Sequence, residues 1–186
     1  LPEPYGAHLQ YIIPHPETQT LAKSMADKGV RRIEVRGTWP PPNMQLLRVL
    51  YDWGFLRNDL VKVSGTQIGI MDVIAQYLIQ SEEGKKTELY GYALHVEVIG
   101  KQGGGKVQHI LTHTHPLADG SVEGWENLRA YTRCVGIPLS IGAQLIAKGR
   151  AKTIGTVFPE FAFDPQEIFK ELEKRKIFVH HSVSSL

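Results

Sequence analysis

The sequence has a single cysteine, Cys134, and no apolar run that approaches the roughly 20 residues needed to cross a bilayer. One thiol cannot form an internal disulfide, so we expect a cytoplasmic protein rather than a disulfide-stabilised secreted one. The net charge is only +2, which gives no basic field for nucleic acid or for an anionic membrane surface. Hydrophobic residues make up 42% and charged residues 22%, which is typical of a soluble globular protein.

Nucleotide-binding motifs are also lacking. No GxGxxG opens a strand-to-helix turn, so the chain has no dinucleotide-binding fingerprint. Residues 100–106, GKQGGGK, match the start of a phosphate-binding loop, but Val107 replaces the Ser or Thr that would hold magnesium. A strand pattern rather than a helix follows the glycines. We therefore interpret residues 100–105 as the glycine-rich tip of a β-hairpin.

Histidines gather on one predicted strand, where His109, His113 and His115 share a face. His113 and His115 lie about 7 Å apart along that face, a spacing that allows metal binding. HExxH and paired cysteines are missing, so we predict no metal site and keep the histidine strand as an alternative. Cys134 is interpreted as a small buried residue of a helix rather than as a catalytic thiol.

Local patterns predict elements in the order β-α-β-α-β-α, then a β-hairpin, then helices. Strands are expected at residues 8–13, 30–36, 60–63, 89–99, 107–114, 153–158 and 177–180. Helices are expected at residues 16–28, 44–53, 68–80, 131–149 and 164–175. This order predicts an α+β fold, in which a mixed, mostly antiparallel sheet has helices packed mainly on one face. Two helices have predicted inward faces, made of Met44, Leu47, Leu50 and Tyr51, and of Met71, Ile74 and Leu78.

The longest helical pattern covers residues 131–149. Its apolar face repeats at four-residue steps through Ile137, Ile141 and Leu145. Beside it lies a small-residue stripe, which consists of Gly136, Ser140, Ala143 and Ala147. Small side chains let another backbone come close, so we predict that this stripe is an interface. Pro138 leaves two alternatives open, a bend or a new helix start.

A candidate ligand site lies near the start of the chain. His15 and Glu17 flank Pro16 after the first predicted strand, and Arg36 ends the second. If these strands are neighbours, the three side chains reach one edge of the sheet. An arginine at a strand end is suited to clamp a carboxylate. The alternative, a surface arginine and a helix-capping glutamate, stays open on the residues alone.

Several segments, in order along the chain, resemble the C-terminal domain of the saccharopine dehydrogenase family. Residues 132–160, TRCVGIPLSIGAQLIAKGRAKTIGTVFPE, are similar to that family's proline-containing helix, small-residue helix and PE turn. IIPHPETQTL resembles its HPE segment, VRRIEVRG its arginine-bearing strand, and DPQEIFKELEKRKIFV its closing helix and strand. Together these segments cover nearly all of the chain.

The resemblance implies an oxidoreductase of the lysine and polyamine type, which oxidises or forms a C–N bond in an amino-acid substrate. In such enzymes NAD(P) binds an N-terminal Rossmann domain, so no cofactor is expected on this chain. Arg36 would hold a substrate carboxylate, and His15 and Glu17 would line the same cleft. Saccharopine-forming members have an arginine where this chain has Pro16, which favours lysine, a carboxyspermidine-like molecule or an unassigned substrate.

On this resemblance residues 1–186 form a single substrate-binding and dimerisation domain. Residues 125–186 are expected to pack toward a Rossmann domain that precedes Leu1, and the isolated chain is expected to be inactive. The small-residue stripe would then contact that domain or a second copy of the chain in a homodimer. The alternative function is a non-catalytic ligand-sensing or interaction domain of the same fold.

Overall fold

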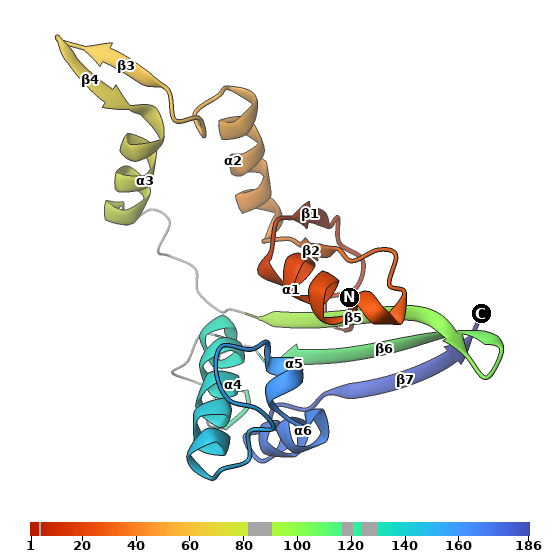
Figure 1. Ribbon diagram of the computed structural model, residues 1–186. Helices are drawn as coiled ribbons and strands as arrows, with labels where there is room; N and C mark the ends of the chain where they lie inside the picture. The colour runs from red at the N-terminus through yellow and green to blue at the C-terminus, as the bar shows by residue number, and fades with distance from the viewer. Residues whose placement is uncertain (4, 82–90, 117–120, 124–129) are drawn as a thin grey trace. The chain divides into compact units, whose positions relative to one another are not determined.

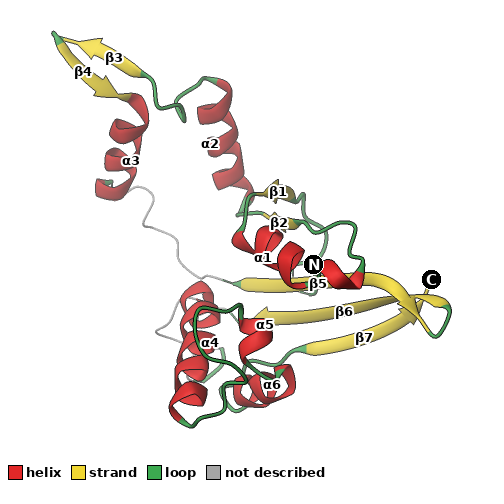
Figure 2. Cartoon of the chain, in the orientation of Figure 1, coloured by secondary structure: helices red, strands yellow, loops and turns green. Residues whose placement is uncertain are grey.

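A computed structural model describes the chain except for residue 4 and residues 82–90, 117–120 and 124–129 (Figure 1). The described residues contain six α-helices and seven strands, which confirms the α+β class (Figure 2). The chain divides into two compact units. The first comprises Leu1–His8, Pro14–Val35 and Leu89–Leu186, and the second comprises Leu9–Ile13 and Arg36–Glu88.

The first unit contains a three-stranded antiparallel sheet in the order β5-β6-β7. The strands are β5 (Tyr92–Gln102), β6 (Gly105–His115) and β7 (His180–Ser185). Gly103 and Gly104 connect β5 to β6 with φ of +59° and +85°, both in the left-handed region that favours glycine. The predicted hairpin is therefore confirmed, and no helix follows the glycines to make a phosphate site.

The core of the first unit lies between α4 (Ala130–Ala147) and α6 (Pro165–Glu173), which pack against each other (Figure 1). Ile141 and Leu145 of α4 are buried together with Leu172 and Ile177. Burial of one such side chain contributes about 1.5–3 kcal/mol. Pro138 lies inside α4 without ending it, so the predicted apolar face continues across the proline.

Shorter elements complete the first unit, namely α1 (Pro16–Ser24), the 3₁₀ helix η1 (Ala26–Lys28) and α5 (Pro159–Ala162). The predicted strand at residues 153–158 is wrong, because this segment is a loop that precedes α5. Gly155 has φ of +98°, and Ile154 is 94% exposed. The helix predicted from residue 164 is confirmed as α6, where the Asp164 side chain accepts a hydrogen bond from the Gln166 backbone N–H at 2.8 Å.

The second unit consists of two small sheets and two helices. β1 (Tyr11–Ile13) pairs with β2 (Val35–Gly37), and β3 (Leu60–Val63) pairs antiparallel with β4 (Thr66–Gly69). Ser64 and Gly65, both with positive φ, connect β3 to β4. The helices are α2 (Pro41–Asp52) and α3 (Ile70–Gln80). The α2 helix begins three residues before the predicted start because Pro41 and Pro42 fit the first helical positions.

The predicted inward faces of α2 and α3 are largely uncovered. Leu50 is buried, but Tyr51 is 68% and Leu78 48% exposed. Leu47 and Met71 are exposed as well. Of the residues predicted to face inward only Leu50 is buried, because within the described residues little packs against these sides of the helices. None of the described helices has the length and apolar character needed to span a membrane.

Candidate functional site

The first predicted site residues lie at the start of α1. His15 is the N-cap, with extended backbone, and Pro16 occupies the first helical turn. The His15 carbonyl accepts hydrogen bonds from the backbone N–H of Thr18 at 3.1 Å and from its hydroxyl at 2.7 Å. The His15 ring nitrogen Nδ1 contacts the Glu17 carboxylate. The structure therefore brings His15 and Glu17 together as an imidazole–carboxylate pair, with side chains 42% and 52% exposed.

Arg36 lies in the middle of β2 and is exposed. A proline segment follows it, with Pro40 as the N-cap of α2, so the backbone beyond β2 is stiff. The neighbouring Arg32 donates to the Glu34 carboxylate from Nε at 2.8 Å. Arg36 belongs to the second unit, whereas His15 and Glu17 belong to the first. Their convergence on one substrate therefore stays a prediction.

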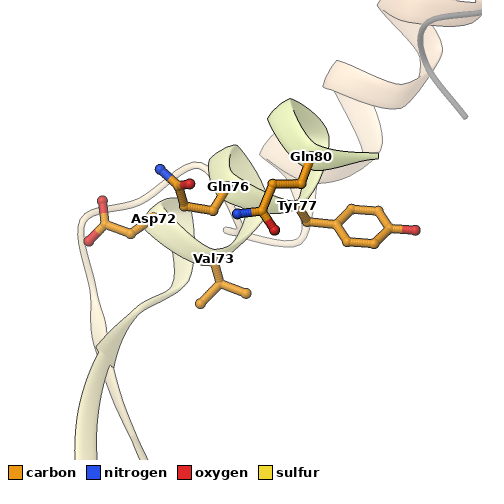
Figure 3. A pocket seen from close by; sticks show the side chains of 5 residues that line it. All are labelled: Asp72, Val73, Gln76, Tyr77 and Gln80. Carbon is orange, nitrogen blue, oxygen red and sulfur yellow. The ribbon is translucent and has the colours of Figure 1, made fainter. Parts of the chain in front are cut away.

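A shallow hollow of about 400 Å³ lies along α3 (Figure 3). It is lined by Asp72, Val73, Gln76, Tyr77 and Gln80. All five side chains come from one helix, and Val73 and Tyr77 are 53% and 65% exposed. None of the predicted site residues lines this hollow, and one exposed helix face gives no enclosed place for a small substrate. We therefore assign it no binding role.

The three histidines of β6 lie in two different environments. The His109 ring is partly exposed and stacks on His181, with ring centroids 5.3 Å apart. His113 and His115 are buried, with exposed fractions of 5% and 1%. Cys134 of α4 approaches them, and its sulfur lies 3.6 Å from Nδ1 of His115. The sequence placed the histidines on one face, but it gave no signal that Cys134 joins them.

The small-residue stripe lies on the exposed side of α4. All four members, Gly136, Ser140, Ala143 and Ala147, are exposed, while Ile141 and Leu145 face the core. A Cβ added at Gly136 would meet nothing within 4 Å. The stripe is therefore open to a partner, and its role as an interface stays a prediction.

Comparison with known families identifies the class of protein. The sequence matches the saccharopine dehydrogenase C-terminal domain family over residues 3–177. This match covers well over half of the chain, so the chain belongs to that family, as the segments quoted above indicated. No curated protein matches the sequence.

Proposed function

We propose that this chain is the substrate-binding and dimerisation domain of a nicotinamide-dependent oxidoreductase. The reaction oxidises or forms a C–N bond in an amino-acid or polyamine substrate. NAD(P) binds a Rossmann domain outside this chain, and the chain alone does not catalyse hydride transfer. The observation that carries this proposal is the family match over residues 3–177. The exposed position of Arg36 on β2 supports its part in binding.

Arg36 acts as the carboxylate clamp of the proposed site. A guanidinium donates two parallel hydrogen bonds to a carboxylate, a geometry that lysine cannot reproduce. A hydrogen bond to a charged group contributes about 1.5–3 kcal/mol, which corresponds to roughly 10- to 150-fold in affinity. The His15–Glu17 pair supplies a second polar group, because the carboxylate holds the imidazole in one orientation.

The experiment uses the enzyme that contains this chain together with its cofactor domain. Arg36→Ala should raise KM for the amino-acid substrate about 10- to 100-fold and change kcat little, because the clamp binds substrate and transition state alike. Arg36→Lys should recover only part of the loss. Steady-state kinetics with varied amino acid and saturating cofactor measure both constants.

Arg48→Ala is the matched control. Arg48 belongs to the same unit, its side chain is 70% exposed, and its Nε donates to Asp52 at 2.8 Å. This variant should keep the KM of the unaltered enzyme. An unchanged KM in Arg36→Ala would contradict the clamp. Absence of any amino-acid oxidation by the complete protein would favour a ligand-sensing or interaction domain instead.

A further inference from the structure

A group of three potential metal ligands, two buried histidines and a half-buried cysteine, lies between the sheet and α4 of the first unit. His113 and His115 are at the end of β6, and Cys134 is in the first half of α4. One ring nitrogen of each histidine and the Cys134 sulfur all lie within 4.8 Å of one another. The imidazole rings meet edge to face, with centroids 5.7 Å apart. Two imidazoles and one thiolate are a ligand set that zinc accepts.

His113 is held in the tautomer that a metal requires. Its Nδ1 lies 2.9 Å from the Phe178 carbonyl oxygen, which can only accept, so Nδ1 carries the proton. The Phe178 carbonyl can accept this bond because Phe178 precedes β7, which begins at His180, and so takes no part in the strand pairing between β6 and β7. The lone pair of His113 is therefore on Nε2. Within the described residues this buried atom has no hydrogen-bond partner. A backbone carbonyl on the far nitrogen is the usual support of a metal-binding histidine.

The spacing of Cys134 and His115 also fits a metal. A tetrahedral zinc with ordinary Zn–S and Zn–N bonds places sulfur and nitrogen about 3.6 Å apart. The Cys134 sulfur and His115 Nδ1 are 3.6 Å apart, a separation that suits an S–H···N hydrogen bond in the metal-free chain and also suits two ligands of one ion. The two atoms therefore already have the separation of two ligands of one ion.

The electrostatic surroundings keep both histidines neutral. Burial, followed by the proximity of His113 and Arg133, lowers the pKa of His115 to about 4. Burial, together with the charge of His180, lowers the pKa of His113, although its bond to Phe178 acts in the opposite direction. Burial raises the pKa of the Cys134 thiol to about 11, against the effect of Arg133. The histidines need to lose no proton on binding, whereas the thiol must lose one.

We propose that His113, His115 and Cys134 bind one divalent transition-metal ion, with zinc as the best fit to this ligand set. On binding, the Cys134 S–H bond breaks, its proton passes to the solvent, and a metal–thiolate bond forms. Three protein ligands leave one tetrahedral position for water or a small molecule. This site is independent of the proposed oxidoreductase function, since neither Arg36 nor the His15–Glu17 pair takes part.

Titration of the purified, untagged chain with Co²⁺ tests the proposal without any substitution. A cobalt–thiolate bond gives a charge-transfer band in the near ultraviolet, and tetrahedral cobalt gives intense visible bands. Both should saturate at one equivalent, and equimolar Zn²⁺ should abolish them. In weakly buffered solution, zinc addition should release about one proton per chain at neutral pH.

Variants separate this site from the other histidines of the sheet. Cys134→Ser should abolish the charge-transfer band, and Cys134→Ser and His115→Ala should each weaken zinc binding more than about 100-fold. His109→Asn is the matched control, because His109 lies on the same strand as His113 and His115 but pairs with His181 of β7. Circular dichroism reports whether each variant is folded. The proposal would be overturned if the unaltered chain showed no cobalt–thiolate band. It would also be overturned if His109→Asn lost this band while Cys134→Ser kept it.

Discussion

Glu171 forms the best-defined surface cluster of α6. It accepts hydrogen bonds from Lys174 Nζ at 2.6 Å and from Arg175 Nη1 at 2.7 Å. Arg175 also donates from Nη2 to the side-chain oxygen of Gln144 of α4 at 3.0 Å, so the cluster connects the two helices of the core. The hydrogen bonds from Lys174 and then Arg175 hold the pKa of Glu171 at about 2, below its ordinary value of 4.5. The ionised carboxylate is therefore favoured by the folded state.

This shift predicts the sign of a pH effect. A carboxylate whose pKa is lower in the folded state stabilises the fold above pH 4.5, and this contribution is lost as the pH falls toward 2. Glu171→Gln should lower the Tm at pH 7, and the difference from the unaltered chain should shrink between pH 4.5 and pH 2. Thermal denaturation followed by circular dichroism measures it. Glu173→Gln, an exposed position of the same helix, should show no such trend, and a pH-independent difference for Glu171→Gln would contradict the prediction.

The proximity of two candidate site residues could be predicted from the sequence only where the two residues are close along the chain. His15 and Glu17 are two residues apart at a helix start, so their pairing follows from local geometry. His113 and His115 share a strand face for the same reason. Cys134 reaches His115 only because α4 packs next to the end of β6, and no local pattern contains that information. The single cysteine therefore looked like a simple packing residue.

At the scale of secondary-structure elements, the β5–β6 turn gives a clear prediction. Both turn residues have positive φ, with +59° at Gly103 and +85° at Gly104. A side chain at Gly104 meets no atom within 4 Å, so only backbone strain opposes it. Gly104→Ala should therefore destabilise the chain by about 1–2 kcal/mol, measured by urea denaturation.

Gly100 provides the matched control for this turn. It lies inside β5, has no positive φ, and an added Cβ there also meets nothing within 4 Å. Gly100→Ala should be neutral or slightly stabilising, because alanine restricts the unfolded chain without straining the strand. Equal effects of the two substitutions would show that the turn conformation does not decide stability.

Helices with a strong repeat of apolar residues could be predicted from the sequence, whereas short elements with a weak repeat could not. α4 was predicted well because Ile137, Ile141 and Leu145 repeat at helical spacing over several turns. The segment 153–158 has β-branched residues, but a strand needs a neighbour. The backbone bonds around this segment are those of a loop and a helix start instead, such as the bond from the Lys152 N–H to the Ala162 carbonyl at 2.7 Å and the bond from the Phe161 N–H to the Phe158 carbonyl at 3.0 Å. The strand β4 was missed because Ile68 is its one large apolar residue, whereas the equally short β3 has three.

At the scale of the whole molecule, the second unit has little core of its own. Among its described residues, Leu50 is the sole hydrophobic side chain that is buried. Trp53 is 76% and Leu60 65% exposed. Exposed apolar side chains in such number suit the association with other protein that we propose. Sequence periodicity predicted which sides are apolar but not whether the covering partner belongs to the same chain.

α4 has a similar uncovered side in the first unit. Val135, Leu139 and Ile146 are 52%, 74% and 62% exposed, on the side of the helix opposite the core. On a helical projection they lie next to the small-residue stripe. Large apolar side chains beside a line of small ones form a surface that a second helix can enter closely. This arrangement supports our proposal that α4 contacts a second copy of the chain or the Rossmann domain.

Ala143→Glu tests this interface, because a carboxylate buried without a partner costs several kcal/mol. In sedimentation experiments the unaltered chain should self-associate, and Ala143→Glu should weaken that association at least about tenfold. Gln166→Glu adds the same charge at an exposed position of α6 and should leave association unchanged. If the chain is monomeric, the same pair of variants applies to its binding of the separately produced Rossmann domain. If Ala143→Glu weakens only the binding of the Rossmann domain, the surface belongs to the interface with that domain. If Ala143→Glu changes neither self-association nor binding of the Rossmann domain, the interface on α4 is contradicted.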